Sequence, residues 1–481
     1  MRRVLVASAL LASLSGCTLI PDYFRPGLPV SDSYPSGPAF GGPGSVPGNV
    51  AGVPAASLGW RDFFTDPVMQ DLITLSLENN RDLRVAALNV SAAEAQYRIQ
   101  HASLFPTIDA TASGDFEREP AGATGSSGAL HINAYSLGLG AASYELDVFG
   151  RLRSLSRQAQ ERYLSSAETQ LSTQIGLVAS VASYYLAWLA DRDAIRVSTD
   201  TAKAQQRSYD LERLILSQGS GTASDVAQAE STLRTAQASL EQYTRQAAQD
   251  LDQIVLLVGA PLPPDLQTRM MAQAGLGDKS VFPVLPAGLP SDLLTRRPDI
   301  RAAEHTLLAA NANIGAARAA FFPSVVLTGS GGTTSGTLGS LFGAGTASWL
   351  FQPQISVPIF DAGSNFANLD YAKLQKRIEI ANYEKAIQSA FHDVADALAA
   401  RATYTRQVDA QTKLVAADTR FFNISQLRVN AGVDTYLNEL VAQSSLFGAQ
   451  LNLVSLRLAE QQNLVTLYKA LGGGWTDRTK S

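Results

Sequence analysis

The side chains that could do chemistry are few and are spread along the 481 residues of this chain. No His-Glu-x-x-His motif places two histidines on one helical face, and no glycine precedes a lysine as a phosphate-binding loop requires. Neither a Gly-x-Ser-x-Gly turn nor a Gly-x-Gly-x-x-Gly loop occurs. The pair His392-Asp393 could supply half of a metal site, but a solvated or intersubunit polar contact is the preferred interpretation. The sequence therefore predicts no enzyme, no metal site and no cofactor.

One cysteine stands where covalent modification is expected. Cys17 is the only cysteine, and it follows a start with two arginines and the apolar run 4–14. The sequence Leu14-Ser15-Gly16-Cys17 resembles the signal of bacterial lipoproteins, which implies removal of residues 1–16 and a lipid on Cys17. An ordinary buried cysteine of a secreted protein is the alternative. The resemblance also implies passage to the outer membrane, because Thr18 is not the aspartate that retains such proteins at the inner membrane.

The overall composition excludes some classes of protein. Hydrophobic residues make up 46% of the chain, charged residues 17%, and the net charge is −5. A nucleic-acid-binding protein would carry a basic stripe, which is absent, so no nucleic-acid partner is predicted. Beyond the N-terminus no run of eighteen apolar residues appears, and no transmembrane helix is predicted.

The second informative feature is a tandem duplication. Asp82-Leu83-Arg84 recurs as Asp299-Ile300-Arg301, and Pro106 recurs as Pro323, both at an offset of 217 in the numbering. Two further landmarks recur with slightly smaller offsets: Gly150 as Gly363, offset 213, and Gly221 as Gly432, offset 211. The predicted divisions are a signal peptide 1–16, a lipidated Pro/Gly-rich tether 17–59, repeats 60–260 and 290–475 with a linker 261–289 between them, and a tail 476–481.

Each repeat is predicted to contain a helix, two strands and a long helical hairpin. The helical pattern after Gly150 contains no proline for about 68 residues, which would span ~100 Å and indicates a coiled-coil-like element. The strands alternate polar and apolar residues. In the first repeat the predicted elements are helix 66–104, strands 107–117 and 134–149 around loop 119–133, and helices 151–218 and 222–258. In the second repeat they are helix 290–320, strands 324–333 and 348–360 around a glycine-rich loop 329–345, helix 363–431 and a return helix to 471.

Four strands per chain are too few for a closed barrel. About eight strands are the minimum in a membrane, and an open sheet edge there would leave backbone groups without hydrogen bonds. The chain therefore needs partner copies, and three chains with four strands each would give twelve strands.

Several motifs, taken in order, resemble the TolC-like outer-membrane efflux proteins, and most of all their OprM/NodT-type lipoprotein branch. The likeness runs from Cys17 to Trp475, and its order and spacing carry it more than any one motif. The matching segments are Trp60–Phe64, Asn79–Arg84, Tyr97–Ile99, Tyr144–Gly150, Pro358–Gly363, Arg428–Asp434 and Leu467–Trp475.

The resemblance implies an α+β membrane protein. Long helical hairpins would form a trimeric periplasmic α-barrel, capped by a 12-stranded transmembrane β-barrel with four strands per chain. It implies a passive homotrimeric conduit in the outer membrane of a Gram-negative bacterium, exporting drugs or other toxic small molecules. Its partners would be a periplasmic adaptor protein, an inner-membrane transporter of the resistance-nodulation-division type and outer-membrane lipid. A conduit for protein secretion, or a coiled-coil envelope lipoprotein without a channel, are the alternatives.

The resemblance also places the gate and the adaptor contact. The constricting leucine of the family corresponds to Leu437, and its pore-ring aspartate corresponds to Val441, so an apolar gate is expected, with Glu439 pointing elsewhere on the helix. Leu437 could equally be a seam residue of the coiled coil. By the offset of 211, Leu437 and Val441 correspond to Val226 and Glu230. The expected adaptor-contact residues at the helix tips are Gly219, Gly221, Asp225, Arg428, Gly432 and Asp434.

Overall fold

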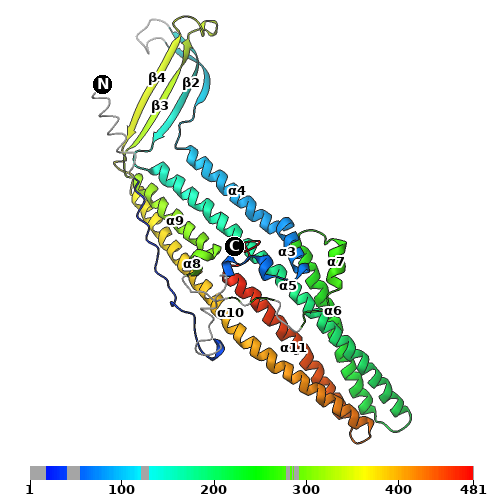
Figure 1. Ribbon diagram of the computed structural model, residues 1–481. Coiled ribbons are helices and arrows are strands. Elements are labelled where there is room, and N and C mark those ends of the chain that lie inside the picture. Colours follow the sequence, from blue (N-terminus) through cyan, green and yellow to red (C-terminus); the bar gives the residue numbers. More distant parts are fainter. Residues whose placement is uncertain are drawn as a thin grey trace. The chain divides into compact units, whose positions relative to one another are not determined.

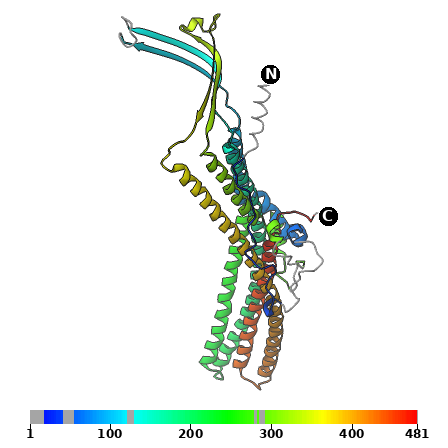
Figure 2. The same cartoon turned by 90° about the vertical axis from the view of Figure 1, so that its left-hand side faces the viewer.

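The computed structural model describes residues 18–40, 55–120, 129–277, 282, 283, 285 and 292–479. Within them the chain forms two compact units (Figures 1 and 2). Of the described residues, unit 1 contains those within 18–26, 89–166 and 303–383, and unit 2 contains those within 27–88, 167–302 and 384–479. The predicted signal peptide, Cys17, part of the tether and much of the linker lie outside the described residues.

Unit 1 contains a four-stranded antiparallel sheet in the order β1-β2-β3-β4. Its strands are β1 (Asp109–Glu119), β2 (Leu130–Leu146), β3 (Ser324–Ser335) and β4 (Ala347–Ser356), so the prediction of two strands per repeat is confirmed. The predicted strand 324–333 and the predicted glycine-rich loop 329–345 overlapped, and the structure confirms the strand for the shared residues and contradicts the loop there. Gly329, Gly331 and Gly332 lie in β3 because they pair with both β2 and β4.

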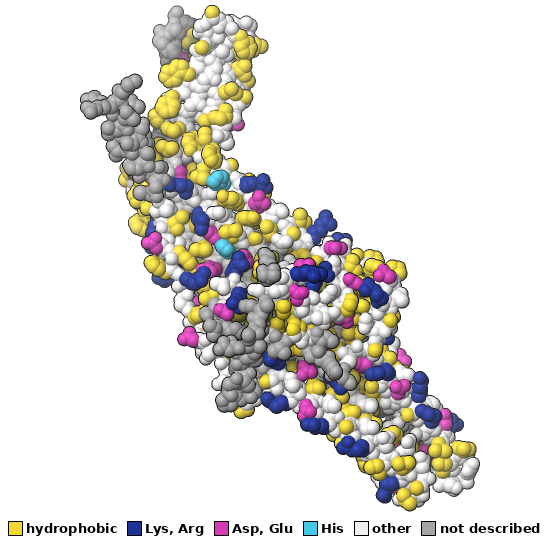
Figure 3. Space-filling view, in the orientation of Figure 1, with side chains coloured by type: hydrophobic (Ala, Val, Ile, Leu, Met, Phe, Trp, Pro, Cys, Tyr) yellow, Lys and Arg dark blue, Asp and Glu magenta, His cyan; other side chains and the backbone are white. Residues whose placement is uncertain are grey.

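The two faces of the sheet differ in polarity. Directly paired residues share a face, which puts Leu139, Gly331 and Trp349 on one side. Trp349 is 82% exposed there, and Phe351 on the same face is 61% exposed. The opposite face carries hydroxyl pairs, Ser113 with Ser136 at 2.8 Å and Thr334 with Ser348 at 3.1 Å. Figure 3 shows hydrophobic and uncharged side chains over the sheet, whereas Lys and Arg gather over the helices.

Two helical hairpins carry most of the chain. Helices α5 (Arg151–Ser217) and α10 (Ser364–Asn430) have 67 residues each, and return helices α6 (Ala223–Val258) and α11 (Tyr436–Ala470) follow them. These bounds agree with the prediction to within a few residues. Helix α5 contains a stretch long and apolar enough to cross a membrane by length and composition, with a mean hydropathy of 1.2, and 56% of it is buried inside the structure.

The first helix of each repeat is interrupted, which the sequence pattern did not predict. The segment predicted as helix 66–104 is α3 (Pro67–Asn79) followed by α4 (Arg81–Ala102), and the one predicted as 290–320 contains α8 (Leu293–Arg296) followed by α9 (Pro298–Ala319). Asn80 at the first break is extended, with ψ 133°, and its side chain accepts a hydrogen bond from the Leu83 amide. Arg297 at the second break precedes a proline, which disfavours the helical conformation.

The predicted linker contains a helix, α7 (Pro264–Met271), which begins at a proline and buries Leu266 and Met270. Composition alone predicted no structure there, because the proline that suggested a linker also starts a helix. Four short helical segments complete the described elements: η1 (Pro38–Phe40), η2 (Ala55–Ser57), α2 (Trp60–Phe63) and η4 (Leu338–Ser340).

The duplication is confirmed, and the backbone gives its register. Three glycines of the first repeat with positive φ, Gly150, Gly219 and Gly259, match Gly363, Gly432 and Gly472, each at an offset of 213 in the numbering. All six adopt φ between 71° and 86°, where side chains with a Cβ are strained. The pairing of Gly221 with Gly432 was therefore wrong, because Gly219 is the residue in the left-handed conformation that ends the helix.

Candidate functional site at the helix tips

The tip of the first hairpin is a tight, well-capped turn. The Ser220 amide donates to the Ile215 carbonyl at 3.2 Å, and the Gly219 amide donates to the Leu216 carbonyl at 2.9 Å. This pattern closes the end of α5 around the left-handed Gly219. Thr222 then starts α6 in a reciprocal capping box with Asp225. Of the residues predicted here, Gly219 and Asp225 thus have clear local roles.

The tip of the second hairpin repeats the turn but is held by side chains. The Val433 amide donates to the Arg428 carbonyl at 3.0 Å, and the Arg428 guanidinium meets Asp434 at 2.9 Å. Asn438 donates to the Asp434 carboxylate at 2.6 Å. These hydrogen bonds from Asn438 and Arg428 and one from a backbone amide lower the pKa of Asp434 below its usual value. Arg428, Gly432 and Asp434 therefore form one structured turn.

The three residues predicted for the pore constriction lie on two sides of α11. Leu437 and Val441, one turn apart, are 55% and 51% exposed, whereas Glu439 is 9% exposed. Glu439 thus points away from the face that Leu437 and Val441 share, as the helical period predicts. At the offset of 213 the counterparts of Leu437 and Val441 are Ser224 and Gln228. The earlier pairing with Val226 and Glu230 used the wrong offset.

Glu439 belongs to a buried acidic cluster that sequence reasoning missed. Glu212 on α5 is 5% exposed, and the charges of Asp225 and Glu439 act on it. Burial raises the pKa of Glu212, and these two charges raise it further. Burial also raises the pKa of Glu439, against a hydrogen bond with Gln426 on α10. The two carboxyls come from different hairpins and lie far apart in the sequence, so no local motif could show the cluster.

A phenol completes this cluster at the start of α11. Burial raises the pKa of Tyr436 to about 12; Ser208 of α5 opposes the shift, and Glu212 and Glu439 add to it. The cluster therefore holds acidic groups from α5, α6 and α11 in one place.

We expect the packing of the two tips to depend on pH. A carboxyl whose pKa is raised in the packed state stabilises that state when it is protonated, and the contribution is lost as pH rises through the raised pKa. Tip amides, corrected for intrinsic exchange, should therefore be more protected from hydrogen exchange at about pH 5 than at about pH 8. The double variant Glu212→Gln, Glu439→Gln should remove the difference.

The matched control for this experiment is Glu230→Gln. Glu230 is an exposed acid on α6 that pairs with Arg234 at 3.1 Å within the same helix. This variant should keep the pH dependence of the wild type. An unchanged pH dependence in the double glutamine variant would show that the cluster does not control tip packing.

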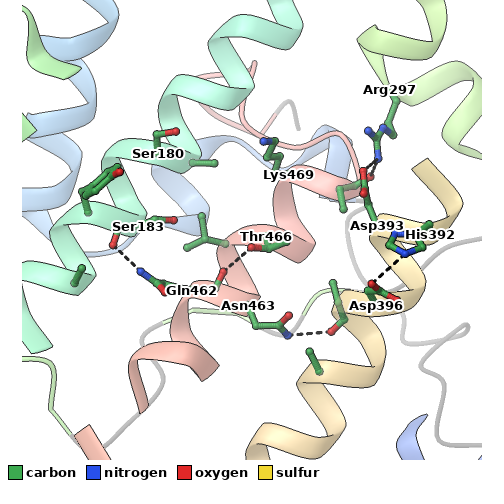
Figure 4. Close-up of a pocket in the computed structure, with 17 residues that line it drawn as sticks. Ser180, Ser183, Arg297, His392, Asp393, Asp396, Gln462, Asn463, Thr466 and Lys469 are labelled. Carbon is green, nitrogen blue, oxygen red and sulfur yellow. Dashed lines mark hydrogen bonds and ion pairs between the residues drawn. The ribbon is translucent and has the colours of Figure 1, made fainter. Parts of the chain in front are cut away.

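A cavity of about 740 Å³ lies in unit 2 over the C-terminal end of α11 (Figure 4). Its two side walls are repeat counterparts, because each wall residue on α5 has its partner on α10 at the offset of 213. The walls are Ala179, Ser180, Ser183, Tyr184 and Ala187 of α5, and His392, Asp393, Asp396, Ala397 and Ala400 of α10.

The pair His392-Asp393, considered above as half of a metal site, lines this cavity, and both side chains already pair with other residues. His392 Nε2 meets Asp396 at 3.4 Å, and Asp393 meets Arg297 at 3.2 Å. In the part of the chain that the structure describes, no three His, Cys, Asp or Glu side chains are grouped to hold a metal ion. The pair is thus an intrahelical contact beside an interhelical ion pair.

Comparison with known proteins places the chain in a family. The family model described as outer membrane efflux protein matches residues 72–260 and 289–473, once per repeat. The chain is 50% identical to a toluene efflux pump outer membrane protein, TtgC of Pseudomonas putida, over 97% of this chain and 94% of the relative. It is 39% identical to the outer membrane protein OprJ of Pseudomonas aeruginosa, over 98% and 96% of the two chains. The chain therefore belongs to the outer membrane efflux protein family.

A solved structure supports the same assignment. The open state of the MtrE outer membrane channel of Neisseria gonorrhoeae matches with a TM-score of 0.86 and 40% identity, covering 97% of this chain and 100% of that one. The fold is that of the TolC-type channels of the Gram-negative outer membrane. The protein is accordingly an efflux channel component, and its family is a family of channels rather than an enzyme class.

Proposed function

We propose that the chain is one subunit of a trimeric conduit that works with a periplasmic adaptor and an inner-membrane transporter to export toxic small organic molecules. The single observation that carries the proposal is the amphipathic sheet with two open edges, β1 and β4, in a member of this efflux family. Relatives named for toluene and antibiotic efflux support the substrate class, and a transporter of the resistance-nodulation-division type is the partner we expect.

Edge pairing between copies explains the oligomer. Strand β1 of one copy would pair with β4 of the next, which satisfies the backbone groups that an open edge leaves in lipid. Three copies give twelve strands, above the minimum for a membrane barrel. The apolar face with Trp349 and Phe351 would then meet lipid, and the hydroxyl face would line the pore. Sedimentation of the detergent-extracted protein tests this: a trimer supports the proposal, and a monomer contradicts it.

The N-terminal segment supports a lipid anchor on Cys17. Residues 18–26 lie along α9: the Leu19 carbonyl accepts from Arg318 at 3.1 Å, and the Pro21 carbonyl accepts from Asn311 at 2.8 Å. Arg25 then forms a two-point ion pair with Glu304 at 2.8 and 3.0 Å. Arg318 lies in the last turn of α9, shortly before β3 begins, so this strap would hold a lipid on Cys17 close to the strands in the membrane.

The exposed turns of both hairpins are the proposed adaptor contact. Gly219, Gly221, Arg428 and Gly432 lie at or beside turns whose backbone is already closed by internal hydrogen bonds. A preformed turn loses little conformational entropy on binding, which favours affinity. Opening would follow if the adaptor binds the open arrangement of these turns more tightly than the closed one.

Replacement of Leu437 by alanine is expected to raise the closed-state conductance of the channel in planar bilayers severalfold. A ring of exposed leucines narrows the pore and resists wetting, and alanine removes most of that apolar bulk. In the first repeat the counterpart is Ser224, which is also small, so the repeated fold accepts a small side chain at this position. The control is Leu214→Ala, an exposed leucine on α5 with a similar exposed fraction, 54%. Equal closed-state conductance in Leu437→Ala and the wild type would show that Leu437 does not form the gate.

A further inference from the structure

The root of each hairpin is a repeated junction. The C-terminal end of α6 meets the break before α4, where the Asn80 side chain donates to the Leu257 carbonyl at 2.8 Å. The C-terminal end of α11 meets the break before α9, where Arg297 donates to the Ala470 carbonyl at 3.2 Å. Leu257 and Ala470 are repeat counterparts at the offset of 213, so Asn80 and Arg297 perform the same capping role in the two repeats.

The two junctions differ in charge. Arg297 also binds the Asp299 carboxylate through two nitrogens, at 3.0 and 2.5 Å, and reaches Asp393 on α10 at 3.2 Å. The counterpart of Asp393 on α5 is Ser180, which is uncharged. An ion pair therefore ties α10 to the junction in the second repeat, and the first repeat lacks the residues for it (Figure 4).

A second contact also attaches α10 in the second repeat and has no equivalent donor in the first. Asn463 of α11 donates to the Ala397 carbonyl of α10 at 2.9 Å, and Asn463 is 9% exposed. Its counterpart on α6 is Asp250, whose carboxylate has no proton to donate when ionised. Burial raises the pKa of Asp250, and Asp191 of α5 has its pKa raised to about 7 by burial and by the charge of Asp250. The first hairpin thus carries the carboxyl of Asp250 where the second has the hydrogen-bond donor Asn463.

Arg297 is well suited to hold a helix in place. Its side chain is 12% exposed, while its partners Asp299 and Asp393 are 38% and 47% exposed, so the ion pair is anchored on the buried guanidinium and partly screened at the carboxylates. Burial acts to lower the pKa of Arg297, but the hydrogen bonds and charges of Asp299 and Asp393 outweigh it and the pKa is raised. The guanidinium remains charged and bridges α9, α10 and the end of α11 at one point.

We propose that the Arg297–Asp393 ion pair is a clamp that fixes the root of the second hairpin, so that its tip can hold Leu437 in a closed ring. The proposal rests on the conduit function proposed above. Helix α11 separates the clamp from Leu437 by about 50 Å at 1.5 Å per residue, so it acts as a lever. A ring of side chains closes only when each copy places its residue to within about 0.5 Å, which a loose root prevents.

The test is single-channel recording of the full-length protein in planar bilayers. Asp393→Ser gives α10 the residue that α5 already carries, and it leaves Arg297 bound to Asp299 and Ala470. We expect the probability of spontaneous opening to rise about tenfold, the size of one direct side-chain coupling. Arg297→Asn, the residue of the first junction, should have the same effect. The double variant should match the single ones, because either change breaks the same pair.

The matched control is Asp396→Ser, one turn further along α10. Asp396 is 70% exposed and pairs with His392 in its own helix, so its loss should leave opening unchanged. The thermal unfolding midpoint of Asp393→Ser should stay near that of the wild type, since Asp393 is 47% exposed and can be solvated. If Arg297→Asn does not fold, Asp393→Ser decides alone.

Two negative results are distinguishable. Wild-type opening in Asp393→Ser, while Leu437→Ala conducts, would overturn the clamp and leave the conduit intact. No conductance from any variant, Leu437→Ala included, would contradict the conduit and the clamp with it.

Discussion

Gly472→Val is expected to prevent accumulation of folded protein in the outer membrane, and Gly259→Val is expected to do the same. Both glycines adopt positive φ, 83° and 73°, which costs about 1–2 kcal/mol for a residue with a Cβ. A Cβ at Gly472 would lie 2.8 Å from the Arg296 carbonyl oxygen, and one at Gly259 would lie 2.6 Å from that of Asn79. Backbone must then move, at about 1–3 kcal/mol more.

These costs are large against the whole stability of a domain, about 5–15 kcal/mol. Immunoblots of outer-membrane fractions and thermal unfolding of any protein recovered would measure the loss. Gly448→Ala is the control: Gly448 lies within α11 with nothing within 4 Å of a built Cβ, and alanine favours helix by about 1 kcal/mol. Normal levels of Gly472→Val would show that the left-handed junction is not needed.

Phe63→Ala should destabilise unit 2 by about 3–5 kcal/mol, the usual cost of removing a fully buried aromatic ring. Phe63 has no exposed surface, and its ring stacks on Tyr468 with centroids 4.0 Å apart. Phe64 at 4.8 Å and Phe282 at 5.1 Å complete the cluster. The ring joins α2 near the start of unit 2 to α11 near the end of the chain.

Denaturant unfolding monitored by tryptophan fluorescence would measure the change. Phe63→Leu, which keeps more of the side-chain volume, should lose clearly less than Phe63→Ala, because a smaller cavity remains. Equal stability of Phe63→Ala and the wild type would show that the cluster does not hold these two segments together.

The long elements could be predicted from the sequence because their signals are local. The period of apolar residues and the glycines at their ends located α5 and α10 to within a residue or two, and alternation located the four strands. The breaks at Asn80 and Arg297 were missed because the helical period continues through them, although Pro298 was a local signal for the second break; the tertiary hydrogen bonds of both residues appear only in the structure. The register of the tips was also wrong, since Gly219 and Gly221 look alike until φ distinguishes them.

In the candidate site, too, local features could be predicted from the sequence and tertiary contacts could not. The orientation of Leu437 and Val441 away from Glu439 follows from the helical period alone. The cluster of Glu212 with Glu439, and the ion pair of Arg297 with Asp393, join residues on different helices. Both arise only when the hairpins pack, so the sequence pattern contains no sign of either.

The most direct test of the central claim is dye accumulation in a strain that has the matching pump and adaptor but lacks its own outer-membrane channel. Expression of this chain should lower the steady-state level of a fluorescent efflux substrate in the cells, as the conduit account predicts. Unchanged accumulation, with the protein present as a trimer in the outer-membrane fraction, would contradict that account.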